Sequence, residues 1–333
     1  MKIVDGVKTY VGNDAGFPLI LENQSRIKEF DVVSWVERNR DYVTSSIQEY
    51  GAILFRGFDI DSVKCFEALA KACTSDNWVE YIEATSPRSQ VESKTSTSTD
   101  YDRTYKIFPH NEKSYSADWP RYVFFYCKNP ASALGSTPLV DCRRVFQSIP
   151  EHIKERFRRE KLMYVRQFSS YMGIPWQKAF NVDSKNDLED YCKNNHIDNV
   201  EWKDDGTPKL SYLRNTAIKH PQTGEFCWFN HGVFFNVHAM EQKLKDIFLS
   251  AFTEDELPYN TYYGSGDRIE KNVVDIISDI YYKNSVSIPY ESNDVIFVDN
   301  ILVAHGREPY EGDRKVYVTM TEKMTLSEAE FIA

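Results

Sequence analysis

Strongly apolar, strand-like runs lie in the middle and near the C-terminal end of this chain, and helix-like stretches separate them. Residues 121–130, RYVFFYCKNP, predict a strand that is buried on both faces and closed by Asn129-Pro130. Residues 294–324 predict two apolar strands joined by a turn-rich segment. We therefore expect a mainly β fold, an antiparallel barrel or sandwich with helical additions, rather than a regular alternation of strands and helices.

The first part of the chain predicts a helix, a strand and a second helix. Residues 28–50 carry apolar side chains at helical intervals and end at a glycine, and residues 52–58 form a short strand-like run. Residues 61–73 return to helical spacing, with Asp61 or Ser62 as the N-cap.

The rest of the chain mixes loops, helices and short strands. Residues 89–104 are rich in Ser, Thr and charged side chains and predict a mobile loop. Shorter predicted segments are 133–146 (turn, strand and helix start), 220–230 (turn, then strand), 240–252 (helix) and 267–284 (helix). We expect one domain over residues 1–333, with a largely helical insertion around 147–205 and a helical segment around 240–284.

The balance of charge limits the classes of partner. The 333 residues carry a formal net charge of −10, so the chain repels nucleic-acid phosphates and anionic membrane surfaces. The densest basic run, RFRRE at 156–160, fits the solvated face of a helix. We expect a small-molecule substrate and no nucleic-acid or membrane partner, while the oligomeric state stays open.

The distribution of cysteines and the N-terminal residues indicate the cellular compartment of the protein. The six cysteines are scattered and include no CxxC spacing, which indicates free thiols in a reducing compartment. The N-terminus lacks the charged and apolar regions of a signal peptide, and no run of about 18 apolar residues occurs. We therefore expect a cytoplasmic protein.

The sequence contains neither of the glycine-rich phosphate-binding motifs GxGxxG and GxxxxGK[ST], which disfavours a nucleotide-binding fold.

His110 and Glu112, within IFPHNEKSY at 107–115, are candidate metal ligands. Residues two apart in a strand project from one face, so an imidazole and a carboxylate can meet one ion. His305, at the end of an apolar strand, is the best third ligand. Two histidines and one carboxylate leave open positions on the metal, as in non-haem iron enzymes that bind a cosubstrate and dioxygen.

Other side chains fit a metal site less well. No cysteine lies near either segment in the sequence, so a closed structural zinc site is disfavoured. His231 and His238 could form a pair, although seven positions would put them on opposite faces of a continuous strand. The remaining histidines lie in helical, polar or turn contexts: His152, His196 and His220.

Six segments taken together resemble the clavaminate synthase-like branch of the taurine dioxygenase family, the Fe(II)- and 2-oxoglutarate-dependent oxygenases. The likeness spans most of the chain and is strongest to hydroxylases of peptide-antibiotic pathways, of the syringomycin-biosynthesis type. The segments, in chain order, are GAILFRGF (51–58), FPHNEKSY (108–115), WPRYVFFYC (119–127), GSTPLVDCRRV (135–145), HPQTGEFCWFN (220–230) and DNILVAHGREPYEGDRKVYV (299–318).

The resemblance implies a fold, a ligand set and a cosubstrate. The family fold is a double-stranded β-helix, a jelly-roll barrel, with His110, Glu112 and His305 on the iron. Related halogenases replace the carboxylate by a small residue so that chloride can bind, so Glu112 argues against halogenation. The family pattern places Thr137 and Arg314 on 2-oxoglutarate. A guanidinium suits the distal carboxylate because it donates two parallel hydrogen bonds.

Some assignments within this resemblance stay open. Lys315 and Arg307 are alternatives to Arg314 as the cosubstrate cation. Arg88, together with Arg121 or Arg307, could hold a substrate carboxylate, and residues 89–104 could act as a lid.

The resemblance implies hydroxylation of a small amino acid, free or bound to a carrier protein, with O2 as the second cosubstrate. Desaturation or epoxidation would need the same residues. The rival hypotheses are a non-catalytic jelly-roll binding protein and a zinc or manganese cupin with hydrolytic or isomerising activity.

Overall fold

A broad sheet forms the centre of the computed structural model, which describes residues 1–24, 30–83, 85, 89–92, 94–98, 101–169 and 173–331. Within these residues the sheet has nine strands, and all neighbours are antiparallel except β3 and β4. Its order is β1 (Lys2–Val4), β2 (Val7–Val11), β3 (Leu19–Glu22), β4 (Ala52–Arg56), β18 (Val295–Asp299), β8 (Asp118–Asn129), β21 (Lys315–Thr325), β6 (Thr95–Thr97) and β5 (Gln90–Glu92).

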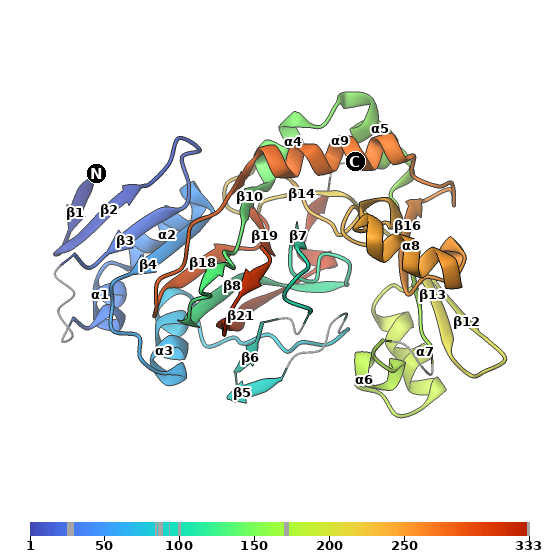
Figure 1. Ribbon diagram of the computed structural model, residues 1–333, viewed down its shortest axis with the longest axis horizontal. Helices are drawn as coiled ribbons and strands as arrows, with labels where there is room; N and C mark the ends of the chain where they lie inside the picture. The colour runs from blue at the N-terminus through green and yellow to red at the C-terminus, as the bar shows by residue number, and fades with distance from the viewer. Residues whose placement is uncertain are drawn as a thin grey trace.

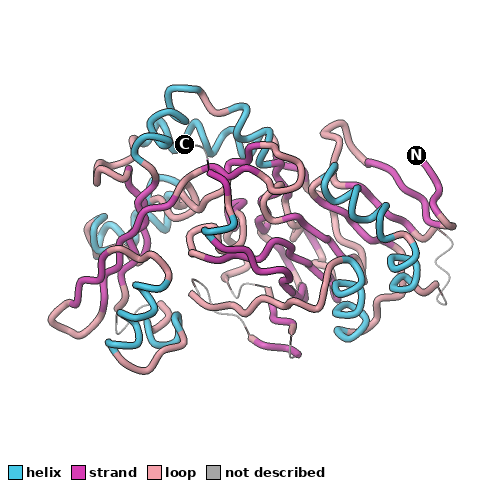
Figure 2. The backbone as a smooth tube through the Cα atoms, turned by 180° about the vertical axis from the view of Figure 1, so that it is seen from behind, coloured by secondary structure: helices cyan, strands magenta, loops and turns pink. Residues whose placement is uncertain are grey.

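A smaller sheet packs against the centre of the broad one. In the described chain it has four strands, in the order β17 (Ser285–Val286), β10 (Leu139–Asp141), β19 (Val303–Arg307) and β7 (Ile107–His110). Interior side chains of both sheets belong to one apolar core, in which Phe125 and Val298 of the broad sheet join Leu139 and Val303 of the small one. The fold is therefore mainly β, with helices on the outside (Figures 1 and 2).

Strand β8 is buried on both faces, as predicted. Because side chains alternate along a strand, Val123 and Phe125 enter the core between the sheets, whereas Phe124 and Tyr126 enter a second core. The second core is closed by three helices that carry the residues predicted as helical near the N-terminus: α1 (Val32–Arg38), α2 (Arg40–Tyr50) and α3 (Val63–Cys73). Ser62, one of the two expected N-caps, accepts a hydrogen bond from the backbone N–H of Cys65 at the start of α3.

The single helix predicted over residues 28–50 is wrong, because α1 and α2 are separate helices. Asn39 (φ −110°, ψ 28°) leaves helical geometry, and its side chain donates to the carbonyl of Trp35. Helix α2 ends at Gly51 (φ +71°), where an added Cβ would lie 2.6 Å from Val303 Cγ2. Glycine is required there because the turn lies against the strand that carries one of the candidate ligands.

The other end of the molecule contains a separate sheet and most of the remaining helices (Figure 1). In the described chain this sheet consists of β12 (Asn199–Trp202), β13 (Pro208–Arg214), β11 (Leu162–Gln167) and β16 (Tyr259–Tyr263). The remaining helices of the described chain are α4 (Cys142–Ser148), α5 (Glu151–Glu160), α6 (Trp176–Phe180), α7 (Lys185–Asn194), α8 (Gln242–Ala251) and α9 (Lys271–Lys283), which confirms the helices predicted over 240–252 and 267–284. The region 147–205 thus contributes two strands, β11 and β12, as well as helices.

Short paired strands and short 3-10 helices complete the fold. One small sheet joins β15 (Phe226–Trp228), β14 (Ala217–Lys219) and β22 (Glu330–Phe331), and β20 (Tyr310–Glu311) pairs with β9 (Ala133–Leu134). Three short 3-10 helices lie at Val237–Ala239, Glu254–Glu256 and Leu326–Glu328 within the described residues.

Two further predictions need correction. The segment 89–104 contains β5 and β6, which extend the edge of the broad sheet through pairing of β6 with β21. The apolar run 294–305 is two strands in different sheets, because a turn at 300–302 carries the chain from β18 to β19. Apolar residues lie on both sides of Asp299 and Asn300, so the run resembles a single strand, and these two polar residues are the trace of the turn in the sequence.

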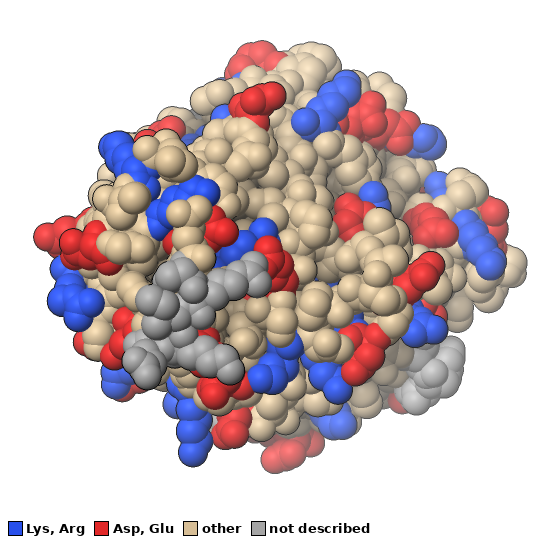
Figure 3. Space-filling view, turned by 60° about the vertical axis from the view of Figure 1, so that its left-hand side comes forward, with Lys and Arg blue, Asp and Glu red and all other residues tan. Residues whose placement is uncertain are grey.

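The surface mixes both signs of charge. On the face shown in Figure 3, Lys and Arg side chains are interspersed with Asp and Glu side chains. Among the described helices, none has the length and apolarity that a bilayer span requires.

Candidate metal centre

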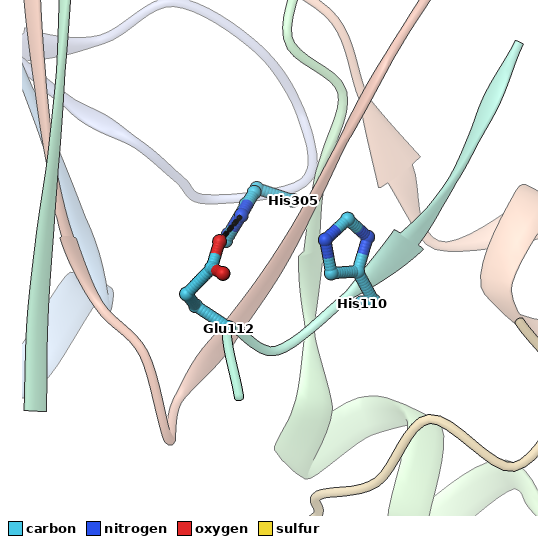
Figure 4. Close-up of side chains that lie close together, drawn as sticks. All are labelled: His110, Glu112 and His305. Carbon is cyan, nitrogen blue, oxygen red and sulfur yellow. Dashed lines mark ion pairs between the residues drawn. The ribbon is translucent and has the colours of Figure 1, made fainter. Parts of the chain in front are cut away.

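His110, Glu112 and His305 converge inside the fold (Figure 4). One ligand atom from each lies within 4.8 Å of the others, and Glu112 and His305 are each 4% exposed. Strands β7 and β19 pair so that His110 and His305 are directly opposite each other, and β10 pairs on the other side of β19. The small sheet therefore places both imidazoles.

Glu112 joins this cluster from a turn, whereas the sequence predicts that it lies on a strand beside His110. Strand β7 ends at His110, so Glu112 lies in the following turn and not on the same strand face. Asn300 holds that turn from across the sheet: its Oδ1 accepts from the Glu112 N–H at 2.7 Å, and its Nδ2 donates to the Glu112 carbonyl at 2.9 Å. Asn111 Nδ2 donates to the Asn300 carbonyl at 2.7 Å.

Asn300 is thus a residue that sequence reasoning missed. It is fully buried in the turn between β18 and β19. A polar residue interrupting the apolar run VDNILV was the available signal, because a buried amide needs several hydrogen-bond partners.

The hydrogen bonds of the cluster suit a metal ligand set. His110 Nδ1 lies 2.8 Å from the carbonyl oxygen of Phe108, which can only accept, so Nδ1 carries the proton and Nε2 keeps its lone pair. His305 Nε2 and Glu112 Oε2 are 3.7 Å apart, too far for a hydrogen bond. A cation shared by both atoms would account for that spacing, and two imidazoles with one carboxylate suit Fe(II).

Aromatic side chains wall the cluster on two sides. The ring of Phe234 stacks on His110 with centroids 4.6 Å apart, and the ring of Phe125 in β8 lies 4.7 Å from His305. Such walls keep water away from a reactive centre and lock the rotamers of its ligands.

One cysteine lies near the cluster in space although it is distant in sequence. Cys142, at the start of α4, has its Sγ 3.2 Å from Asn111 Nδ2. Burial raises the pKa of the Cys142 thiol to about 12, so the thiol stays protonated, and it is not part of the ligand cluster.

The predicted cosubstrate residues lie next to each other. Arg314 donates from Nε to the carbonyl of Gly135 at 2.8 Å, and its Nη2 is 3.5 Å from Thr137 Oγ1. Thr137 lies two residues before Leu139, which pairs with His305, so this group lies at the start of the strand beside the cluster. Tyr290 Oη is 2.8 Å from Thr137 Oγ1, and burial raises the pKa of Tyr290, which keeps its hydroxyl protonated.

The turn that carries Thr137 depends on glycine. Gly135 has φ +74°, and an added Cβ would lie 2.8 Å from Ala131 Cβ and 2.9 Å from Tyr310 Cβ.

Of the two alternatives to Arg314 as the cosubstrate cation, Lys315 is exposed and pairs with Asp313 at 3.1 Å.

Arg307, the other alternative, is also engaged elsewhere. It donates to the backbone carbonyls of Tyr101, Asp102 and Tyr105, and burial lowers its pKa. This arginine therefore ties residues 101–105 to the end of β19.

The other candidate substrate arginines are not placed in the cluster. Arg121 donates to Gln222 and lies 3.9 Å from Asp299, which in turn lies 3.0 Å from His220. Arg88 lies outside the described residues.

His231 lies near the cluster and outside it. His231 and His238 do not share a strand, because residues 232–235 form a turn and His238 lies in a 3-10 helix, and neither histidine belongs to the ligand cluster found among the described residues. The His231 centroid is 5.0 Å from that of His110, and Ser114 Oγ is 2.7 Å from His231 Nδ1. Burial first, and then the charge of His110, lower the pKa of His231 well below its usual range.

Comparisons with known proteins identify the family. Residues 18–320 match the family described as taurine catabolism dioxygenase TauD, TfdA family. The dapdiamide synthesis protein DdaC of Enterobacter agglomerans is 34% identical over 284 residues, which cover 85% of this chain and 86% of that protein. A clavaminate synthase-like protein of Arabidopsis thaliana is 27% identical over 296 residues, 86% of each chain.

Solved structures share the fold. PvcB from Pseudomonas aeruginosa superposes with a TM-score of 0.55 at 14% identity, covering 99% of this chain and 96% of its own. PvcB is described as an Fe, alpha-ketoglutarate dependent oxygenase from an isonitrile synthetic pathway. AAD-2, solved with Mn(II) and N-oxalylglycine, gives a TM-score of 0.53 at 10% identity, covering 95% of this chain and 96% of its own.

The family match covers most of the chain, and a relative above 30% identity covers nearly the same length. The chain therefore belongs to the TauD/TfdA family and is a non-haem iron dioxygenase that depends on 2-oxoglutarate.

Proposed function

We propose that this dioxygenase hydroxylates an unactivated C–H bond of a small amino-acid-like substrate, free or carrier-bound, in the biosynthesis of a secondary metabolite. The observation that carries the proposal is the buried carboxylate of Glu112 beside His305. A carboxylate on the metal occupies the position that a halide would need, which favours oxygen transfer.

The residues have distinct roles in this proposal. His110, Glu112 and His305 hold Fe(II), and Thr137 and Arg314 hold the distal carboxylate of 2-oxoglutarate. Iron and 2-oxoglutarate held there would supply the oxidising chemistry, with dioxygen as the oxidant and succinate and carbon dioxide as the products of the cosubstrate.

The side chains around the metal centre position the metal ligands and exclude water from them. Asn300 fixes the turn of Glu112, and Phe125 and Phe234 shield the two imidazoles. We take the broad and small sheets around this centre to be the two sides of a double-stranded β-helix, and residues 1–333 to be one domain.

The proposed substrate class is supported by a related protein and by the positive charges of three arginine side chains. DdaC, whose name assigns it to dapdiamide synthesis, supports a role in the biosynthesis of an amino-acid-derived product. Arg88, Arg121 and Arg307 stay the proposed partners of a substrate carboxylate, although Arg121 and Arg307 would each exchange a present partner for it. Delivery by a carrier protein and a cytoplasmic location are parts of the same proposal.

A mass-spectrometric screen tests this function. Iron-loaded enzyme is incubated with 2-oxoglutarate, oxygen and single amino acids, and each mixture is analysed for succinate and for a substrate mass increased by one oxygen. Loss of two hydrogens would show desaturation instead. A screen in which no amino acid, free or as a carrier thioester, yields succinate above the level of Glu112→Ala would contradict the proposal.

A further inference from the structure

A fourth histidine lies beside the three candidate metal ligands. His231 is 3% exposed, and its ring centroid is 5.0 Å from that of His110. The ring of Tyr115 meets it edge-on at 4.9 Å and 89°, and the ring of Phe235 lies 4.8 Å away. Its position is therefore within the aromatic lining next to the metal centre.

Several hydrogen bonds fix the orientation of His231. Ser114 Oγ lies 2.7 Å from Nδ1, and the backbone N–H of His231 donates to Tyr164 Oη at 2.8 Å. The next residue, Gly232, donates its N–H to Asn230 Oδ1 at 2.8 Å. Because the backbone and one ring nitrogen are held, the imidazole is restricted to one orientation.

The second ring nitrogen is available to a ligand. His231 Nε2 makes no hydrogen bond to any residue that the structure describes, and His231 is not a member of the metal-ligand cluster. His231 Nε2 is not among the fully buried unpaired side-chain atoms of the described residues, so it keeps some accessible surface at which a ligand or an ordered water can meet it.

We propose that His231 contacts the substrate and, oriented by Ser114, hydrogen-bonds a neutral polar group such as an amide or hydroxyl next to the carbon that is oxidised. This proposal rests on the proposed function and narrows its substrate class. Ser114 acts through His231 and is a positioning residue.

The surroundings favour a neutral group over an ionic one. The walls around His231 are the rings of Tyr115, Phe234 and Phe235, and the carboxylate whose charge acts on His231, Glu112, is itself a proposed metal ligand. A cationic imidazole would also lie beside His110 and the metal cation that His110 would bind, and the repulsion between these charges disfavours pairing with a carboxylate. A hydrogen bond between uncharged partners avoids both costs.

Matched pairs of free amino acids test the substrate class. L-asparagine is compared with L-leucine, and L-glutamine with L-norleucine, as stimulants of succinate formation by the iron-loaded enzyme. We expect each amide to be favoured in kcat/KM by about 10-fold over its apolar partner, and His231→Leu to lose this preference. Equal or better use of the apolar partners by the wild type, or an amide preference that survives in His231→Leu, would overturn the proposal.

A spectroscopic measurement separates substrate contact from metal binding. His231→Leu should keep the visible absorption band of the Fe(II) and 2-oxoglutarate complex at the wild-type iron affinity. Loss of the band would make His231 a ligand and overturn the proposal. Intact binding with no succinate from any amino acid in the wild type would count against the proposed function instead.

The orienting role of Ser114 has a test that needs neither metal nor turnover. Nitrogen NMR of the metal-free protein should show one tautomer of His231 in the wild type and Ser114→Thr, and a mixture in Ser114→Ala. Ser116 is the matched control, since it is also buried but its Oγ makes no hydrogen bond in the described structure. A mixture in the wild type, or an equal effect of Ser116→Ala, would overturn the assigned role.

Discussion

His305 lies directly opposite His110 in the pairing of β19 with β7, and the two imidazole centroids are 5.0 Å apart. Backbone hydrogen bonds between two buried strands thus set the separation of the two candidate ligands. A site built on strands holds its geometry better than one built on loops. The third ligand differs, because Glu112 depends on a turn.

Replacing Glu112 should nearly abolish iron binding. Loss of an outer-shell partner typically costs 10–100-fold in metal affinity, so loss of the carboxylate in Glu112→Ala should cost at least about 100-fold. Calorimetric titration with Fe(II) or Mn(II) measures the change. Glu155→Gln, on the exposed face of α5, is the control and should bind as the wild type does.

Asn300→Ala should lower the affinity for iron although Asn300 is not a candidate metal ligand. The change removes hydrogen bonds to the Glu112 N–H and carbonyl and leaves buried backbone groups unpaired. We expect a loss of about 2–4 kcal/mol in the free energy of unfolding and about 10–100-fold in iron affinity. Denaturant unfolding and metal titration check the two effects, and wild-type iron affinity in a folded variant would contradict the role given to Asn300.

Arg314 and Lys315 make a matched pair for the cosubstrate. Arg314→Ala should raise the KM for 2-oxoglutarate by about 10–100-fold, because a charge-assisted hydrogen bond contributes roughly 1.5–3 kcal/mol. Lys315→Ala should leave that KM unchanged, since Lys315 is exposed and paired with Asp313. The reverse result would move the cosubstrate cation from Arg314 to Lys315.

The buried pair of Glu83 and Arg166 should stabilise the fold. Their side chains are 1% and 0% exposed, with Arg166 Nη1 3.5 Å from Glu83 Oε2. Glu83→Gln should lower the free energy of unfolding by about 3–5 kcal/mol, because it removes the negative charge beside a buried cation. Asp76→Asn breaks the exposed pair with Lys71 and should leave the free energy of unfolding almost unchanged. Similar costs for both variants in denaturant unfolding would contradict this difference.

The N-cap of α1 should show a pH-dependent contribution. Asp31 accepts from the Ser34 N–H at 3.1 Å, and its hydrogen bonds to the Ser34 side chain and backbone lower its pKa. The folded state therefore binds the Asp31 proton more weakly than the unfolded state, whose pKa is about 3.9. Asp31→Ala should cost about 1 kcal/mol at neutral pH, a difference that shrinks as the pH falls below about 4. Unfolding curves at several pH values check it, and a cost independent of pH would be inconsistent with a charged cap.

Much of the fold could be predicted because it follows from local patterns. The continuous apolar run of β8 and the helical periodicity of α3 and α9 are visible in the sequence, because β8 is buried on both faces and each helix buries one face. The break at Asn39 could not be read in this way, because apolar spacing continues across it, whereas the turn at Asn300 left only a short polar interruption in an apolar run.

The candidate site was only partly predictable for the same reason. His110, Glu112 and His305 were chosen from their residue types and from family resemblance, and the structure brings them together. The geometry assumed for Glu112 was wrong, since the strand ends at His110 and a buried asparagine places the carboxylate. His231 and Ser114 are 117 residues apart in sequence, and only the tertiary structure makes them partners.

Anaerobic titration of the protein with Fe(II) in the presence of 2-oxoglutarate tests the central claim most directly. The wild type should develop the weak visible charge-transfer band of the iron–cosubstrate chelate, saturating as the site fills, and His110→Ala should develop none. No band in the wild type, or an equal band in His110→Ala, would contradict the assignment of this site.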